Sequence, residues 1–216
     1  MNWRRRYRYT FIGLFWTITL AAQPPQTLSG RVLGYLVNRI GDYDGLQLRT
    51  AAGVVWLRFP PHTAVQVLKQ GTVGQAVVVT VSRQPSSPKL PGSTDNQTVA
   101  TPVYRLMSVQ NRAKKVGFRV ADLPPPPPAQ GKLVEAEGPL TGKLYDDAGQ
   151  LSALLTDQYV IDLKPHQGES IQALLSGVGR LSVVGYERTE QGFVNKTGRK
   201  LIHPTTLTIN GQTFAL

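Results

Sequence analysis

Six polar or aromatic residues between positions 31 and 58 have side chains that suit an anionic, ring-containing ligand. They are three arginines, a tyrosine, a glutamine and a tryptophan: Arg31, Tyr35, Gln47, Arg49, Trp56 and Arg58. Because successive side chains of a strand point to opposite faces, we expect these six to face outward. The inner face then takes seven apolar residues: Val32, Leu36, Leu46, Leu48, Val55, Leu57 and Phe59. An exposed aromatic ring can stack on a base or a sugar while arginines meet phosphate or carboxylate groups.

A purely structural role for the same residues is the alternative interpretation. Trp56 would then pack under a loop, against a linker or against the second half of the chain, and the arginines would only solubilise the surface. A related strand later in the chain is predicted to turn Gln158, Val160, Asp162 and Lys164 outward, with no aromatic side chain and no net positive charge. The first half is therefore the expected binder.

No catalytic or metal-binding pattern accompanies these residues. The three histidines, His62, His166 and His203, are too far apart in the predicted architecture to be assumed joint ligands, and a metal site needs three or four convergent ligands. The paired aspartates lie in predicted turns, where aspartate is favoured for local hydrogen bonds, and there is no cysteine. We expect a protein that is not an enzyme and uses no cofactor or metal.

The chain contains two copies of one unit. Residues 54–83 match residues 158–188, with Pro61-His62 corresponding to Pro165-His166 and Arg83 to Arg188. The match extends to both sides, so each copy is much longer than the ~20 to 50 residue period of a repeat array. Each copy is expected to be a complete small domain.

Period and turn residues predict the elements of one unit. The first copy has strands near 31–36, 46–50, 54–59, 75–81 and 103–109, with Gly41 to Gly45 closing the first hairpin. Pro60 and Pro61 suit a helix start, Ala64, Val67 and Leu68 form one helical face, and Gly71 can end the helix. In the second copy the helix face falls at Ile171, Leu174 and Leu175, and Asn210-Gly211 predicts a tight turn.

This order of three strands, a helix and two strands resembles the OB-fold, the oligonucleotide- and oligosaccharide-binding barrel. The resemblance implies an all-β chain with one short helix per unit, folded as two small five-stranded barrels in tandem. It also implies that ligand binds on strands one to three, the strands that carry the six residues above. The expected divisions are a signal peptide at 1–22, barrel 1 at 27–120, a proline-rich linker at 121–130 and barrel 2 at 131–216.

Three segments outside the predicted strands complete the organisation. Five consecutive prolines in the linker favour a stiff spacer that keeps the domains apart. Residues 84–101 are rich in proline, serine and polar residues and are expected to form a mobile loop. Residues 111–119 hold the densest basic cluster after the N-terminus, which suits either phosphate contact or a solvated surface.

The N-terminus has the layout of an export signal, with Arg4, Arg5, Arg6 and Arg8 before an apolar run from Thr10 to Ala22. The run is shorter than the ~20 residues of a membrane-spanning helix, which favours cleavage over the alternative of an uncleaved anchor. Four of the 24 basic residues and none of the 13 acidic ones lie in it, which leaves a mature chain of about +7.

These features together predict an exported, periplasmic or secreted, non-catalytic binding protein. Its positive charge favours an anionic polymer on barrel 1, and single-stranded nucleic acid and acidic glycan both fit. The alternative is a structural or assembly component that contacts other proteins of the cell envelope.

Overall fold

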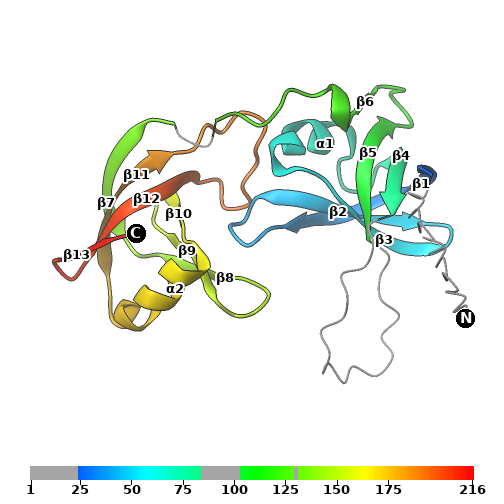
Figure 1. The fold of residues 1–216 in the computed structure, drawn as a ribbon. Helices are drawn as coiled ribbons and strands as arrows, with labels where there is room; N and C mark the ends of the chain where they lie inside the picture. Colours follow the sequence, from blue (N-terminus) through cyan, green and yellow to red (C-terminus); the bar gives the residue numbers. More distant parts are fainter. Residues whose placement is uncertain (1–23, 84–102, 129–130) are drawn as a thin grey trace, which may run out of the picture.

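The computed structural model describes residues 24–83, 103–128 and 131–216. The predicted leader and the predicted loop at 84–101 lie outside these residues. The described chain is built mainly of strands, arranged as two sheets that form two lobes (Figure 1). The all-β prediction is confirmed.

The first sheet is a closed five-stranded barrel with a short extra strand. Its order is β3-β2-β1-β4-β5-β6, and a parallel pairing of β3 with β5 closes it. The strands are β1 (Gln26–Val37), β2 (Tyr43–Thr50), β3 (Gly53–Arg58), β4 (Ala76–Arg83), β5 (Val103–Asn111) and β6 (Gly117–Arg119).

The helix of the first unit lies between its third and fourth strands, as the resemblance to the OB-fold implies. A 3-10 turn η1 (Pro61–Thr63) leads into α1 (Ala64–Gln70), which ends at Gly71. Pro60 and Pro61 end the preceding ladder because proline has no backbone N–H to donate. A second 3-10 turn, η2 (Val120–Asp122), follows β6 and leads to the prolines.

The second sheet repeats the pairings of the first, but its ladder is interrupted where the first barrel has one continuous β1. The order is β7-β11-β12-β10-β9-β8, with β13 added beside β12, and the chain passes from β7 to β8 through residues 140–141. The strands are β7 (Leu133–Pro139), β8 (Gly142–Tyr145), β9 (Leu151–Leu155), β10 (Tyr159–Asp162), β11 (Arg180–Glu187), β12 (Lys200–Ile209) and β13 (Gln212–Ala215).

The helix and the final turn of the second unit also follow the sequence. Helix α2 (Pro165–Gln172), continued by η3 (Ala173–Leu175), lies between β10 and β11. The Gln167 Oε1 accepts a hydrogen bond from the Lys164 amide and so caps the start of α2. Asn210 and Gly211 both have positive φ and join β12 to β13, as the predicted tight turn requires.

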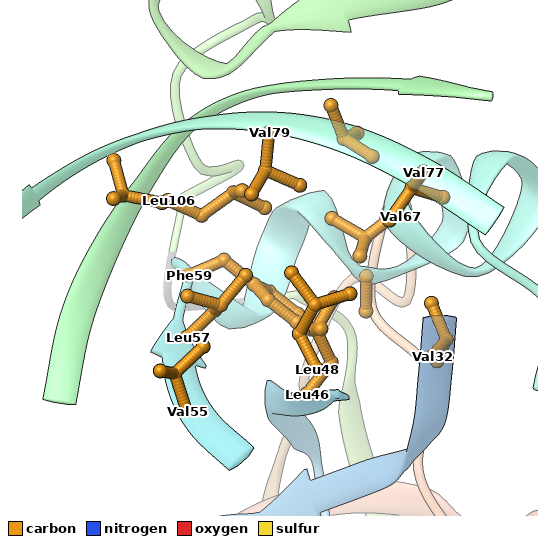
Figure 2. Packing of buried hydrophobic residues seen from close by; sticks show 13 residues of the cluster. Val32, Leu46, Leu48, Val55, Leu57, Phe59, Val67, Val77, Val79 and Leu106 are labelled. Atoms are coloured by element: carbon orange, nitrogen blue, oxygen red, sulfur yellow. The ribbon is translucent and has the colours of Figure 1, made fainter. Parts of the chain in front are cut away.

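Each sheet encloses its own apolar core. The first core is drawn in Figure 2 and includes ten fully or almost fully buried side chains: Val32, Leu46, Leu48, Val55, Leu57, Phe59, Val67, Val77, Val79 and Leu106. Six of the seven residues predicted to fill the first barrel are among them; Leu36 is not. The second core centres on leucines and isoleucines of β9 to β12, among them Leu154, Ile161, Leu181, Ile202 and Leu207.

The expectation that the proline linker keeps the two units apart is wrong. The loop between β1 and β2 lies against the second unit, and the segment that follows β11 returns to the first. Arg39 Nη1 donates to the Leu163 carbonyl at 2.8 Å, and the Tyr43 amide donates to the Val194 carbonyl at 3.0 Å. A stiff linker sets the distance between its own two ends. It does not prevent loops elsewhere in the two units from contacting each other.

Candidate functional site

Five of the six predicted site residues share the outer face of β1, β2 and β3, which we call the platform: Arg31, Gln47, Arg49, Trp56 and Arg58. The strand register brings them into rows. Arg31 is paired with Arg49, and Gln47 is paired with Gly34 on one side and with Trp56 on the other. Residues directly opposite in a ladder point to the same face. Cations therefore lie in the row next to the tryptophan.

The row of the platform that holds Trp56 is open at its β1 end. The indole is partly buried, and Gly34, two strands away in the same row, carries no side chain. A Cβ built at Gly34 would meet no atom within 4 Å. A planar group that stacks on the indole and extends past Gln47 therefore meets no side chain at Gly34.

Two arginines of the platform are exposed, and the charge of the third is partly neutralised by an aspartate. Arg49 is exposed, and the exposed Arg31 donates a hydrogen bond to the Gly74 carbonyl. Arg58 lies 2.5 Å from Asp44, which neutralises part of its charge. Partial burial raises the pKa of Asp44 although the Arg58 guanidinium acts to lower it. Arg58 is therefore a weaker anion contact than the sequence alone suggests.

Tyr35 is not part of the platform, and the prediction that it faces outward is wrong. A β-bulge between Val32 and Gly34 adds Leu33 to β1, and one extra residue reverses the faces of all residues that follow it in the strand. Tyr35 is therefore opposite the buried Leu46, and Leu36 points outward.

The Tyr35 ring packs against the first core instead of binding a ligand. Its hydroxyl donates to the Gly71 carbonyl, and its ring meets that of Tyr43 edge-on with 5.5 Å between centroids. Burial, and to a smaller extent the nearby Tyr43, raises the pKa of Tyr35 to about 12. The hydroxyl holds the end of α1 against β1.

The matching face of the second unit is covered by the first unit. Val160 points out of the second sheet as predicted, but it is fully buried, together with Ala153 and Leu201, under Ile40 of the β1–β2 loop. Asp162 binds Arg39, with Nη2 and Oδ1 2.8 Å apart, whereas Gln158 and Lys164 are exposed. The face equivalent to the platform thus serves as an internal docking surface in the second unit.

A buried ion pair locks the two units together beside this contact. Arg188 donates two hydrogen bonds to Asp42, at 2.6 and 3.1 Å, and the two side chains are 7% and 1% exposed. The guanidinium also lies 3.9 Å from the Phe193 ring centroid. Burial acts to lower the pKa of Arg188, but the hydrogen bonds and charges of Asp42 and Glu190 outweigh it and raise that pKa.

The repeat did not reveal this pair, although Arg188 corresponds to Arg83 in the alignment of the two copies. Asp42 lies in a cluster of turn residues, where its carboxylate is expected to bind nearby backbone amides. The composition of the second unit's outer face could have indicated the contact between the units. Ala153, Val160 and Leu201 form an apolar surface there, and such a surface is usually buried against another part of a protein.

In the described ranges one histidine contacts a carboxylate: His203 Nδ1 lies 3.2 Å from Asp162 Oδ2. No group of three or more histidine, aspartate or glutamate side chains there could hold a metal ion. The imidazole of His62 meets the Phe193 ring edge-on, at 6.3 Å between centroids, and does not cap a helix. Residues 24–83, 103–128 and 131–216 contain no helix that is long and apolar enough to cross a membrane.

Comparison with known proteins gives no relative. No protein-family model, curated protein or solved structure matches the chain.

Proposed function

We propose that this chain is an exported, non-catalytic binding protein that holds an anionic polymer on the platform of its first barrel. The observation that carries the proposal is the shared outer face of Arg31, Arg49, Gln47 and Trp56, with an open position at Gly34 beside them. Indole stacking is tolerant of which ring it meets, and arginines supply charge for phosphate or carboxylate groups. Without the predicted leader, which holds four of the 24 basic residues and none of the 13 acidic ones, the net charge is about +7, and it favours the same class of ligand.

The difference between the two units supports this assignment to the first barrel. The second unit uses its equivalent face to bind Ile40 and Arg39 of the same chain: apolar residues cover Ile40, while Asp162 and Ser152 bind Arg39. The first unit keeps Arg31 and Arg49 of its face exposed, and Gln47 and Trp56 partly exposed. We therefore assign binding to the first unit and support to the second.

Equilibrium binding of labelled polymers tests the proposal. Fluorescence anisotropy would be recorded with oligothymidylate and with oligogalacturonate, at low and at raised salt. We expect binding that weakens with salt and is at least about 10-fold weaker in Trp56→Leu, since stacking contributes about 1–3 kcal/mol per base. The exposed Val65→Leu variant of α1 is a matched control, because Val65 is 43% exposed and lies off the platform.

The two outcomes separate this proposal from its alternative. Loss of binding in Trp56→Leu, with Val65→Leu unchanged, supports the platform as the site. Absence of binding to both polymers would instead favour an assembly component that contacts other proteins of the cell envelope.

A further inference from the structure

A second surface of the first barrel continues directly from the platform. The described prolines, with Leu123 before them, do not project freely into solvent; part of this segment lies beside β4 and β5 and encloses a groove of about 630 Å³. Its lining includes Thr80 and Ser82 of β4 and residues 105–108 of β5. Its rim includes Pro60, His62, Arg119 and residues 123–125.

The strand register joins this groove to the platform without a break. Arg58 at the end of β3 is paired with Arg105 of β5, and Arg105 is paired with Ser82 of β4. Further along β5, Ser108 is paired with Arg119 of β6. Paired residues of neighbouring strands point to one face, so Trp56, Arg58, Arg105 and Arg119 trace one path around the outside of the barrel.

The chemistry along this path alternates between cation and apolar surface. Arg105 and Arg119 are exposed, and the apolar parts come from Met107, which is 39% exposed, and from the prolines. Among the residues that the structure describes, no aspartate or glutamate lines the groove. Phosphate groups need the cations, and planar bases gain from apolar and proline surfaces; the hydroxyl-rich rings of an acidic glycan would leave much of this surface unused.

We propose, resting on the function proposed above, that the ligand is single-stranded nucleic acid and that it runs from the platform into this groove. The bases stack at Trp56 and against the apolar surface of Met107 and the prolines, and Arg105 and Arg119 contact successive parts of the phosphate backbone. From Trp56 to Arg119 the path spans roughly 20 Å, taking ~3.3 Å per residue along a strand and ~4.8 Å between strands. That span places the ligand within the range of about 4–16 nucleotides that an OB-fold holds.

Length-dependent binding to the full chain tests the inference. The probes are labelled oligothymidylates of about 4 and about 16 nucleotides, and the variant is Arg105→Gln/Arg119→Gln. We expect the variant to bind the long probe at least about 10-fold more weakly and the short probe almost as the parent does. For the long probe, the slope of log affinity against log salt should fall by about 1.4, which is about 0.7 for each lost phosphate contact with a single strand.

The control variant removes the same charge from outside the groove. Arg112→Gln/Lys114→Gln alters two exposed residues of the turn that joins β5 to β6. If both double variants lose the same affinity for the long probe, the groove is not the binding site and the loss is a general effect of net charge. Long and short probes that bind equally well to the parent would also overturn it.

Two further arms separate the ligand classes and the two proposals. Inorganic polyphosphate and oligogalacturonate of similar charge should bind more weakly than the long oligothymidylate. If either one binds tightly, with the same dependence on Arg105 and Arg119, nucleic acid is not the specific ligand, but the groove is still the binding site. If Trp56→Leu leaves the short probe's affinity unchanged, the platform fails as a site, which is a separate result from failure of the groove.

Discussion

Gly34 leaves the β1 end of the Trp56 row without a side chain, and this residue can be changed without disturbing the core. It faces outward beside Gln47, and a side chain there meets no atom within 4 Å at its first carbon. Glycine inside a strand costs about 0.5–1 kcal/mol relative to alanine, so a larger residue should not destabilise the barrel. The position therefore separates the binding role of the platform from its role in folding.

We predict that Gly34→Leu weakens binding of an anionic polymer by about 10-fold or more, because its side chain fills the open position next to Gln47 in the row that holds Trp56. Its free energy of unfolding should equal or slightly exceed that of the parent. Urea unfolding and polymer anisotropy measure the two effects, and Gly34→Ala, which should bind almost normally, is the matched control. Unchanged affinity in Gly34→Leu would contradict the position of the site.

Because the pKa of Tyr35 is raised, the free energy of unfolding should decrease at alkaline pH. Its pKa in the folded chain is about 12, against 10.0 for an ordinary tyrosine. Below pH 10 the phenol is neutral in both states, so its contribution is fully present; it is lost as pH rises from 10 towards 12, where the unfolded chain ionises first.

We predict that the free energy of unfolding falls by about 1 kcal/mol more in the parent than in Tyr35→Phe between pH 9.5 and 11.5, after allowance for partial exposure of the ring. Urea titrations at these two pH values measure the difference. Parallel pH profiles in the two proteins would show that the ring is more exposed than its packing against Tyr43 and Gly71 implies.

At the scale of the element, α2 depends on a glycine at its contact with β9. A Cβ at Gly168 would lie 2.0 Å from the Leu151 carbonyl oxygen, a backbone atom that cannot move away alone. The helix therefore approaches its strand more closely than any other residue would permit.

We predict that Gly168→Ala destabilises the chain by about 2 kcal/mol or more, against the usual gain of about 1 kcal/mol for this change within a helix. Thermal or urea unfolding measures the effect. Gly179→Ala is the control, since no atom lies within 4 Å of a Cβ at that position and its φ is not positive. Equal stabilities of the two variants would refute the close approach of α2 to β9.

The elements could be predicted from the sequence because local patterns determine them. Alternation of apolar residues marked the strands, Pro60-Pro61 marked the helix start, and Asn210-Gly211 marked the last turn. The bulge at Leu33 could not be predicted in this way, because no residue type in β1 marks it. It nevertheless reverses the face to which every later side chain of the strand points. The five platform residues lie on the predicted face because they precede the bulge or belong to other strands. Tyr35 follows the bulge in β1 and therefore points to the opposite face.

At the scale of the molecule, the two units are coupled through residues far apart in sequence. Ile40 covers the apolar outer face of the second sheet, and Asp42 with Arg188 forms a buried pair next to it. The Asn195 side chain also donates to the Ile40 carbonyl and to Asp42. Local patterns carry no record of such pairings, which is why the sequence predicted separate domains on a spacer.

We predict that Asp42→Ala lowers the free energy of unfolding by about 3–5 kcal/mol, because it leaves the Arg188 guanidinium buried without its main partner. Calorimetry should also resolve separate transitions for the two units in the variant and a single transition in the parent. The control is Glu137→Ala, which breaks an ion pair with Arg180 whose side chains are both 65% exposed and should cost less than about 1 kcal/mol. A small effect at Asp42, comparable with that at Glu137, would contradict the coupling.

The most direct test of a ligand on the platform is the fluorescence of Trp56 itself. Trp3 and Trp16 lie in the predicted leader, so a full chain with Trp3→Phe and Trp16→Phe leaves Trp56 as its single tryptophan. Titration with oligothymidylate or oligogalacturonate at low salt is predicted to change the emission with at least one of them, and added salt should reverse the change. An emission that neither polymer alters, at concentrations where anisotropy shows binding, would contradict the platform as the binding site.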